Sequence, residues 1–150
     1  MSRFEETLTL SVTAGRAWAA LADIGRIAEW NPGVVTSHRL DSGEVGTGAR
    51  RRCELGGGAY LEEAVARFAP GREISFVITA TNLPLASAEI HFRVAARDGG
   101  CAVTVAPEYR VQCGIVGRLA DPLLVRPAYR HGMRRLLAGL KAHLEGMPGR

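Results

Sequence analysis

The sequence predicts an α+β fold in which a curved antiparallel sheet of seven strands wraps round a long C-terminal helix. One alternating strand opens the chain, and two short helical segments follow it. Six further strand-like runs come next, separated by turns, and one long amphipathic helix closes the chain. The 150 residues are enough to bury a core and contain no repeat or linker, so we expect a single domain over residues 1–150.

The composition is that of an ordinary globular protein, with 47% hydrophobic and 23% charged residues. The net charge of +4 comes from scattered basic residues rather than a dense stripe, so we expect no nucleic-acid partner. No run approaches the ~18 apolar residues of a membrane span, and the first residues lack the apolar core of a signal peptide. We therefore expect a cytoplasmic protein without stable membrane insertion, and the pattern leaves monomer and homodimer open.

The first strand covers residues 4–12, where apolar and polar residues alternate. Thr13 is a suitable N-cap for the helical segment that follows, and Gly25 separates that segment from a second short helix. The turn Trp30-Asn31-Pro32-Gly33 ends the second helix, because proline disfavours helix in the residue before it and glycine permits the turn.

Six strand-like runs then alternate with glycine, proline and asparagine turns. They are residues 34–40, 49–55, 60–68, 73–81, 87–95 and 101–111. The final helix has an apolar stripe from Tyr129 to Leu144. Asp121-Pro122 is expected to begin this helical region, and Pro127 is expected either to kink it or to delay its regular part.

No motif for metal or nucleophilic chemistry occurs in the sequence. Cys53, Cys101 and Cys113 form no CxxC pair, so we interpret them as small buried apolar residues. The four histidines form no sequence pattern typical of metal ligands or of a catalytic triad, and His91 lies in the exposed phase of its strand. Neither HExxH nor GxSxG is present. We therefore expect no metal and no other cofactor.

Several motifs together resemble a known superfamily. They are the helix 14–23, the Trp30-Asn31-Pro32 turn, the Gly46-Thr47-Gly48 loop before the third strand, Glu63-Ala64-Val65 leading to Pro70-Gly71-Arg72, and the long terminal helix. Over nearly the whole chain these resemble the START-like / Bet v 1-like (SRPBCC) superfamily and its polyketide cyclase/dehydrase-like branch. The resemblance implies the helix-grip fold, with a pocket between the concave sheet and the long helix.

Strand phase then predicts which residues line that pocket. In the run 49–55, Arg50, Arg52 and Glu54 form the exposed phase, which leaves Arg51 and Cys53 on the inner side. An inward arginine can anchor an anionic group of a ligand. The alternatives are that its head stays in water at the rim or pairs with a nearby glutamate.

The run 60–68 is ambiguous, because either phase directs one glutamate inward, Glu62 or Glu63. The inward glutamate either pairs with Arg51 or acts as a base. Trp30 either stacks on a flat ligand or closes the core, and Tyr109 either donates a hydrogen bond to a ligand or packs on the terminal helix. The candidate ligand-binding residues are Trp30, Arg51, Cys53, Glu62, Phe76, Ile78, Phe92, Val105 and Tyr109.

The resemblance and this lining imply the binding of a small hydrophobic or amphipathic molecule of lipid, polyketide or aromatic type. The alternative is a polyketide cyclase/aromatase-like enzyme, in which Arg51 stabilises an enolate, Tyr109 acts as acid and Glu62 or Glu63 as base. A protein-interaction role, as in the co-chaperone branch, has no specific support. Convergence of Arg51, Tyr109 and a glutamate on one open space would favour the enzyme.

Overall fold

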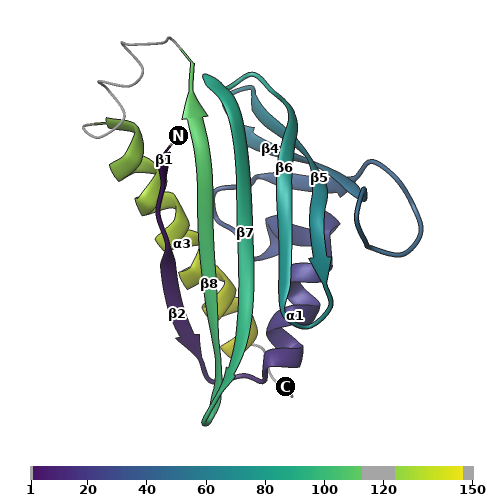
Figure 1. The fold of residues 1–150 in the computed structure, drawn as a ribbon, viewed down its shortest axis with the longest axis vertical. Helices are drawn as coiled ribbons and strands as arrows, with labels where there is room; N and C mark the ends of the chain where they lie inside the picture. Colours follow the sequence, from purple (N-terminus) through teal and green to yellow (C-terminus); the bar gives the residue numbers. More distant parts are fainter. Residues whose placement is uncertain (1, 113–123, 147–150) are drawn as a thin grey trace.

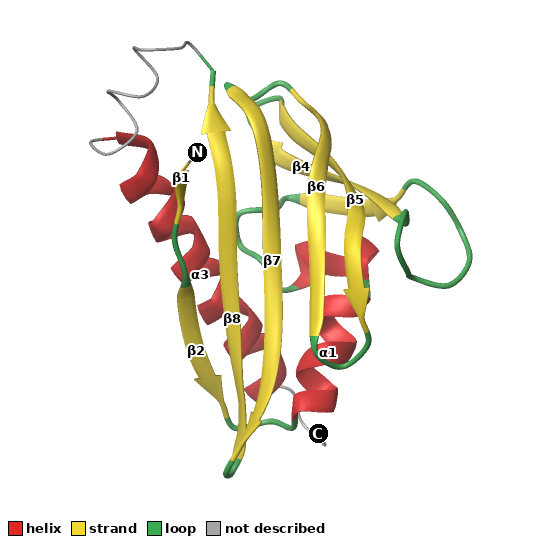
Figure 2. Cartoon of the chain, viewed as in Figure 1, coloured by secondary structure: helices red, strands yellow, loops and turns green. Residues whose placement is uncertain are grey.

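The computed structural model describes residues 2–112 and 124–146, and these residues form one curved antiparallel sheet with helices against its inner face. In Figures 1 and 2 the strands β6, β7 and β8 lie in front, while the helices α1 and α3 lie behind the sheet. This arrangement is the helix-grip fold that the sequence predicts. It places a long helix against the concave face of a sheet that is open on its other side.

The elements follow the expected order. They are β1 Ser2–Arg3, β2 Glu6–Leu10, α1 Ala14–Ala22, the 3₁₀ helix η1 Ile24–Glu29, β3 Thr36–Arg39, β4 Arg50–Gly56, β5 Ala59–Ala69, β6 Glu73–Thr81, β7 Leu85–Arg97, β8 Gly100–Val111 and α3 Arg126–Glu145.

The sheet has eight strands in the order β1-β8-β7-β6-β5-β4-β3, and β2 also pairs with β8. The expected seven-stranded sheet is confirmed, since β1 and β2 are two parts of the predicted first strand and pair with β8 in one continuous register. Both parts end up at the opposite sheet edge from β3, which brings the N-terminal strand beside α3 (Figure 1).

The helix boundaries follow from local chemistry. The Thr13 hydroxyl oxygen accepts a hydrogen bond from the Arg16 amide and caps α1, as the sequence predicts. Pro127 lies in the first turn of α3, where its missing N–H has no intrahelical partner to lose, so it does not interrupt the ladder of the helix. The expected start at Asp121-Pro122 lies outside the described residues.

The core is concentrated at one end of the sheet. The buried residues of α3 are Leu136, Leu137, Leu140 and Leu144, all in the C-terminal part of the helix. They pack with α1, η1 and the inner faces of the strands in one cluster that also contains Trp30. In the N-terminal part of α3, by contrast, Tyr129 and Met133 are only half-buried and Ala128 is exposed.

Candidate ligand-binding cavity

A cavity of about 560 Å³ lies between the N-terminal part of α3 and the inner face of the sheet. Small-molecule sites in proteins typically enclose ~300–1,000 Å³, so this volume suits one ligand. Its wall comes from the turn after η1, the strands β4 to β8 and the first three turns of α3. Gly33, Pro84 and Leu124 lie on its rim and are exposed.

The cavity follows from how the apolar stripe of α3 is used. From Leu136 onward the stripe is fully buried against the core. Met133 and Tyr129, one and two turns earlier, are only half-buried and line the cavity instead. The small residue Gly132 lies on the same helix face and leaves open space where a side chain would project. The C-terminal half of α3 therefore packs against the core, and its N-terminal half forms one wall of the cavity.

Arg51 points inward from β4 and lines the cavity, as its strand phase predicts. It is only 3% exposed, so the alternative of a head group in water at the rim is wrong. Its Nε donates to Glu63 Oε1 at 2.9 Å and its Nη1 donates to the Ile24 carbonyl at 3.2 Å. Its guanidinium carbon lies 3.8 Å from the centre of the Phe76 ring. The predicted pairing with a glutamate is confirmed.

Glu63, and not Glu62, is the glutamate on the inner side of β5. Glu63 is 5% exposed and lines the cavity. Glu62 lies on the outer side, where it accepts a hydrogen bond from Arg52 at 2.7 Å. The choice of Glu62 as a cavity residue was therefore wrong.

The reason for this error is the irregular pairing of β5. Its register against β6 shifts between Glu62 and Glu63 and again between Val65 and Arg67. A bulge inserts an extra residue and breaks the strict alternation. Val65 is consequently buried and Phe68 also packs against the same core, although the two lie three positions apart. Simple alternation cannot assign such a strand to one phase.

Tyr129 supplies a phenol to the cavity that the sequence analysis did not propose. Its ring stacks on Tyr109 with centroids 4.8 Å apart and meets Phe4 edge-on at 5.7 Å. Burial, with a smaller contribution from the negative charge of Glu63, raises the pKa of Tyr129 well above its usual range. The hydroxyl therefore stays protonated and can donate a hydrogen bond. Its place in the apolar stripe of the last helix was the available signal.

The other sequence-predicted residues divide into two groups. Cys53, Ile78 and Phe92 line the cavity. Trp30, Phe76, Val105 and Tyr109 are buried behind its wall. For Trp30 the structure matches the core-closing alternative, since it is 6% exposed and belongs to the main core. Burial raises the pKa of the Cys53 thiol to about 11, so this thiol is neutral at physiological pH.

Comparison with known proteins places the chain in a family. A family model described as "Polyketide cyclase / dehydrase and lipid transport" matches residues 1–145. The chain belongs to this family. Its members are ligand-binding or polyketide cyclase-type proteins of the SRPBCC superfamily, whose fold binds small hydrophobic ligands. No curated protein matches the sequence.

Solved structures agree on the fold. A START superfamily protein from Mycobacterium smegmatis is 15% identical, with a TM-score of 0.80 over 96% of this chain and 97% of that one. Ara h 8.0201 is 14% identical, with a TM-score of 0.77 over 97% of this chain and 99% of that one. The di-domain ARO/CYC BexL from the BE-7585A biosynthetic pathway is 20% identical, with a TM-score of 0.78 over 97% of this chain and 47% of that one.

At these identities the comparison supports a shared fold alone. Among the described residues, no helix is long and apolar enough to span a membrane.

Proposed function

We propose that this protein binds one small, largely apolar and uncharged molecule in the cavity between α3 and the sheet. The observation that carries the proposal is the cavity itself: about 560 Å³ of space whose wall is mainly aliphatic and aromatic, with a few polar groups. Ligand sites commonly combine an apolar wall with a few fixed polar groups that orient the ligand.

The preference for an uncharged ligand follows from the state of Arg51. Its positive charge is balanced by Glu63 at 2.9 Å, and its Nη1 donates to a backbone carbonyl. A ligand carboxylate would have to displace Glu63, which would leave a buried carboxylate without its partner. An uncharged hydroxyl or carbonyl group faces no such competition. Either group can accept a hydrogen bond from the protonated Tyr129 hydroxyl, and a ligand hydroxyl can also donate one to Glu63.

The experiment uses N-phenyl-1-naphthylamine, an uncharged apolar probe that fluoresces in apolar surroundings, displaced by two competitors of equal chain length. Decanol and decanoate differ mainly in charge. We expect one probe per chain and displacement by decanol at a concentration at least tenfold lower than by decanoate. Stronger displacement by decanoate would contradict the uncharged-ligand proposal, and absence of probe binding would contradict the binding function.

A second candidate is cyclisation of a poly-carbonyl chain, favoured by the meeting of Arg51, Glu63 and Tyr129 at one cavity. The carboxylate would remove a proton, the phenol would protonate a carbonyl oxygen and the apolar wall would fold the chain. Tyr109, the acid that the sequence predicts, lies behind Tyr129 and not in the cavity wall. Conversion of a model poly-β-ketone that disappears in Tyr129→Phe, with probe binding intact, would favour this candidate over simple binding.

A further inference from the structure

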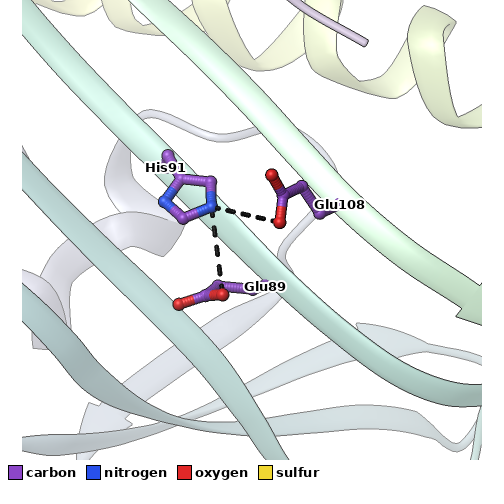
Figure 3. A group of neighbouring side chains, drawn as sticks. All are labelled: Glu89, His91 and Glu108. Carbon is purple, nitrogen blue, oxygen red and sulfur yellow. Dashed lines mark ion pairs between the residues drawn. The ribbon is translucent and has the colours of Figure 1, made fainter. Parts of the chain in front are cut away.

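We propose that Glu89, His91 and Glu108 form a binding site for a divalent transition-metal ion on the outer face of the sheet. Figure 3 shows the three side chains converging, with one nitrogen of His91 facing a carboxylate from each side. One ligand atom from each residue lies within 4.8 Å of the other two. Glu89 also borders the cavity, but the site is on the outer face of the sheet and does not depend on the proposed ligand.

The strand register brings the three residues together. Glu89 and His91 are two positions apart on β7 and share its outer face. Glu108 lies on β8 directly opposite Glu89. Two like charges directly opposite on neighbouring strands destabilise a sheet, and a cation between them removes that repulsion. The pairing of the two glutamates is therefore a local conflict that a bound ion would resolve.

The ring of His91 is already oriented for this role. Its Nδ1 forms a hydrogen bond of 2.7 Å with the hydroxyl of Ser75, which is fully buried on β6. This contact leaves Nε2 directed at the carboxylates, 3.9 Å from Glu89 Oε2 and 3.7 Å from Glu108 Oε2. Histidines that bind metals are commonly held by such a second hydrogen bond at the other ring nitrogen.

The spacing of these atoms is close to that of a metal centre. Zinc binds imidazole nitrogen and carboxylate oxygen at ~2.0–2.2 Å, which separates tetrahedral ligand atoms by roughly 3.4 Å. The observed separations from Nε2 exceed this by only a few tenths of an ångström. The three side chains are 21–38% exposed, so an ion can reach them and they can make this adjustment. Water can complete the coordination.

Among the described residues, no lysine or arginine forms an ion pair with the carboxylate oxygens that face His91. The nearest arginine contact to Glu108 is from Arg3 Nη1, at 3.8 Å, and it involves Oε1 rather than the oxygen that faces His91. Within residues 2–112 and 124–146, the ion pairs of Glu89 involve His91 alone. Mixed imidazole and carboxylate ligands suit zinc and its neighbours in the first transition row.

The sequence analysis expected no metal, because no local motif joins these residues. Positions 89 and 91 are close in the chain, but position 108 becomes their neighbour only through the pairing of β7 with β8. Ala88 and Ile90, which alternate with them on β7, line the cavity, and Glu89 borders it as well. The ion would therefore tie β7 to β8 on the reverse side of the cavity wall.

Zinc titration of the chelator-treated protein, followed by calorimetry, tests this site. We expect one zinc ion per chain at the site, and its loss in both His91→Ala and Glu108→Gln. Ser75→Ala should keep the site but weaken binding by about 10–100-fold, because it removes only the group that orients the ring. His38→Ala, on β3 away from the site, is the matched control and should bind as the unmodified protein does.

Circular dichroism of each variant establishes that it is folded before the titration. A thermal melt with and without zinc gives a second readout, since an ion that binds only the folded state raises the melting temperature. Absence of zinc binding in the folded protein would overturn the proposal. Zinc binding that persists unchanged in both His91→Ala and Glu108→Gln would also overturn it, because the ion would then lie elsewhere.

Discussion

Arg51 and Glu63 form a buried ion pair inside the fold. Both side chains are nearly inaccessible to solvent, and each is held on a strand, β4 or β5, at directly opposed positions. A buried pair contributes little net stability compared with apolar residues of the same size, but a buried charge left alone is strongly destabilising. The pair therefore supplies fixed polar groups at the cavity wall and adds little to the net stability of the fold.

Replacing Glu63 by glutamine should lower the free energy of unfolding by roughly 3–5 kcal/mol, because the charge of Arg51 then stays buried without its partner. Glu62→Gln is the matched control. Its pair with Arg52 is partly exposed and screened by solvent, so its loss should change stability far less. Urea unfolding measures both, and equal losses in the two variants would contradict the assignment of Glu63 to the inner side.

The double variant Arg51→Met, Glu63→Leu separates pairing from packing. It removes both charges together, so it should recover most of the stability that Glu63→Gln loses. Failure to recover would show that the hydrogen bond to Ile24 and the contact with Phe76 matter more than charge balance.

The Cys53 thiol predicts a pH dependence of stability. Burial raises its pKa from about 9 to about 11. The raised pKa means that the folded state favours the neutral thiol, so this contribution is complete below pH 9 and is lost as the pH rises through 11. Between these limits the unmodified protein should lose up to roughly 3 kcal/mol more than Cys53→Ala. A constant stability difference between the two proteins from pH 8 to pH 11 would be the contrary result.

At the scale of elements, the sequence predicted strand faces well wherever pairing is regular. The alternation in β4, β7 and β8 correctly placed Arg51, Phe92 and Val105 on the inner side. The alternation failed in β5, where two register shifts change which alternate residues point toward the inner face from one part of the strand to the next. Local periodicity contains no information on a bulge, because a bulge is defined by the partner strand.

The contact between α3 and the turn after η1 explains the Trp30-Asn31-Pro32 motif. A Cβ atom on Gly139 would lie 2.1 Å from the Trp30 carbonyl oxygen and 2.8 Å from Pro32 Cδ. The helix can approach the turn this closely only because position 139 has no side chain. The motif is thus a packing site for the long helix, and Trp30 closes the core beside it.

Gly139→Ala should therefore destabilise the protein by about 1–3 kcal/mol through overpacking. The matched control is Gly132→Ala on the same helix, where a Cβ would meet nothing within 4 Å. That substitution should be neutral or stabilising by up to about 1 kcal/mol, because alanine favours helix over glycine. Thermal unfolding of both variants gives the comparison, and a stabilising Gly139→Ala would refute the close contact.

For the whole molecule, the order of helices and strands in the sequence was enough to predict the fold. The residues that line the cavity could not be predicted in the same way, because they depend on how α3 packs against the sheet. Of the nine candidate residues, Arg51, Cys53, Ile78 and Phe92 lie at the cavity. Glu62 lies on the outer side of the irregular strand β5. Trp30, Phe76, Val105 and Tyr109 are buried in the core instead, because sequence pattern distinguishes core from solvent but not core from cavity. Tyr129 was missed for the same reason, since cavity and core share one apolar stripe on α3.

The proposed ligand site is the space under the first turns of α3. Gly132 lies on the cavity face of this helix, so Gly132→Leu fills the space with a side chain that also favours helix. Ala138→Leu adds the same side chain at an exposed position of the same helix and is the matched control.

The most direct test is the affinity of N-phenyl-1-naphthylamine for the two variants, with their folding checked by circular dichroism. We expect at least a tenfold loss of affinity in Gly132→Leu and unchanged affinity in Ala138→Leu. Equal affinity of both variants and the unmodified protein would mean that the probe binds elsewhere and that this cavity is not the binding site.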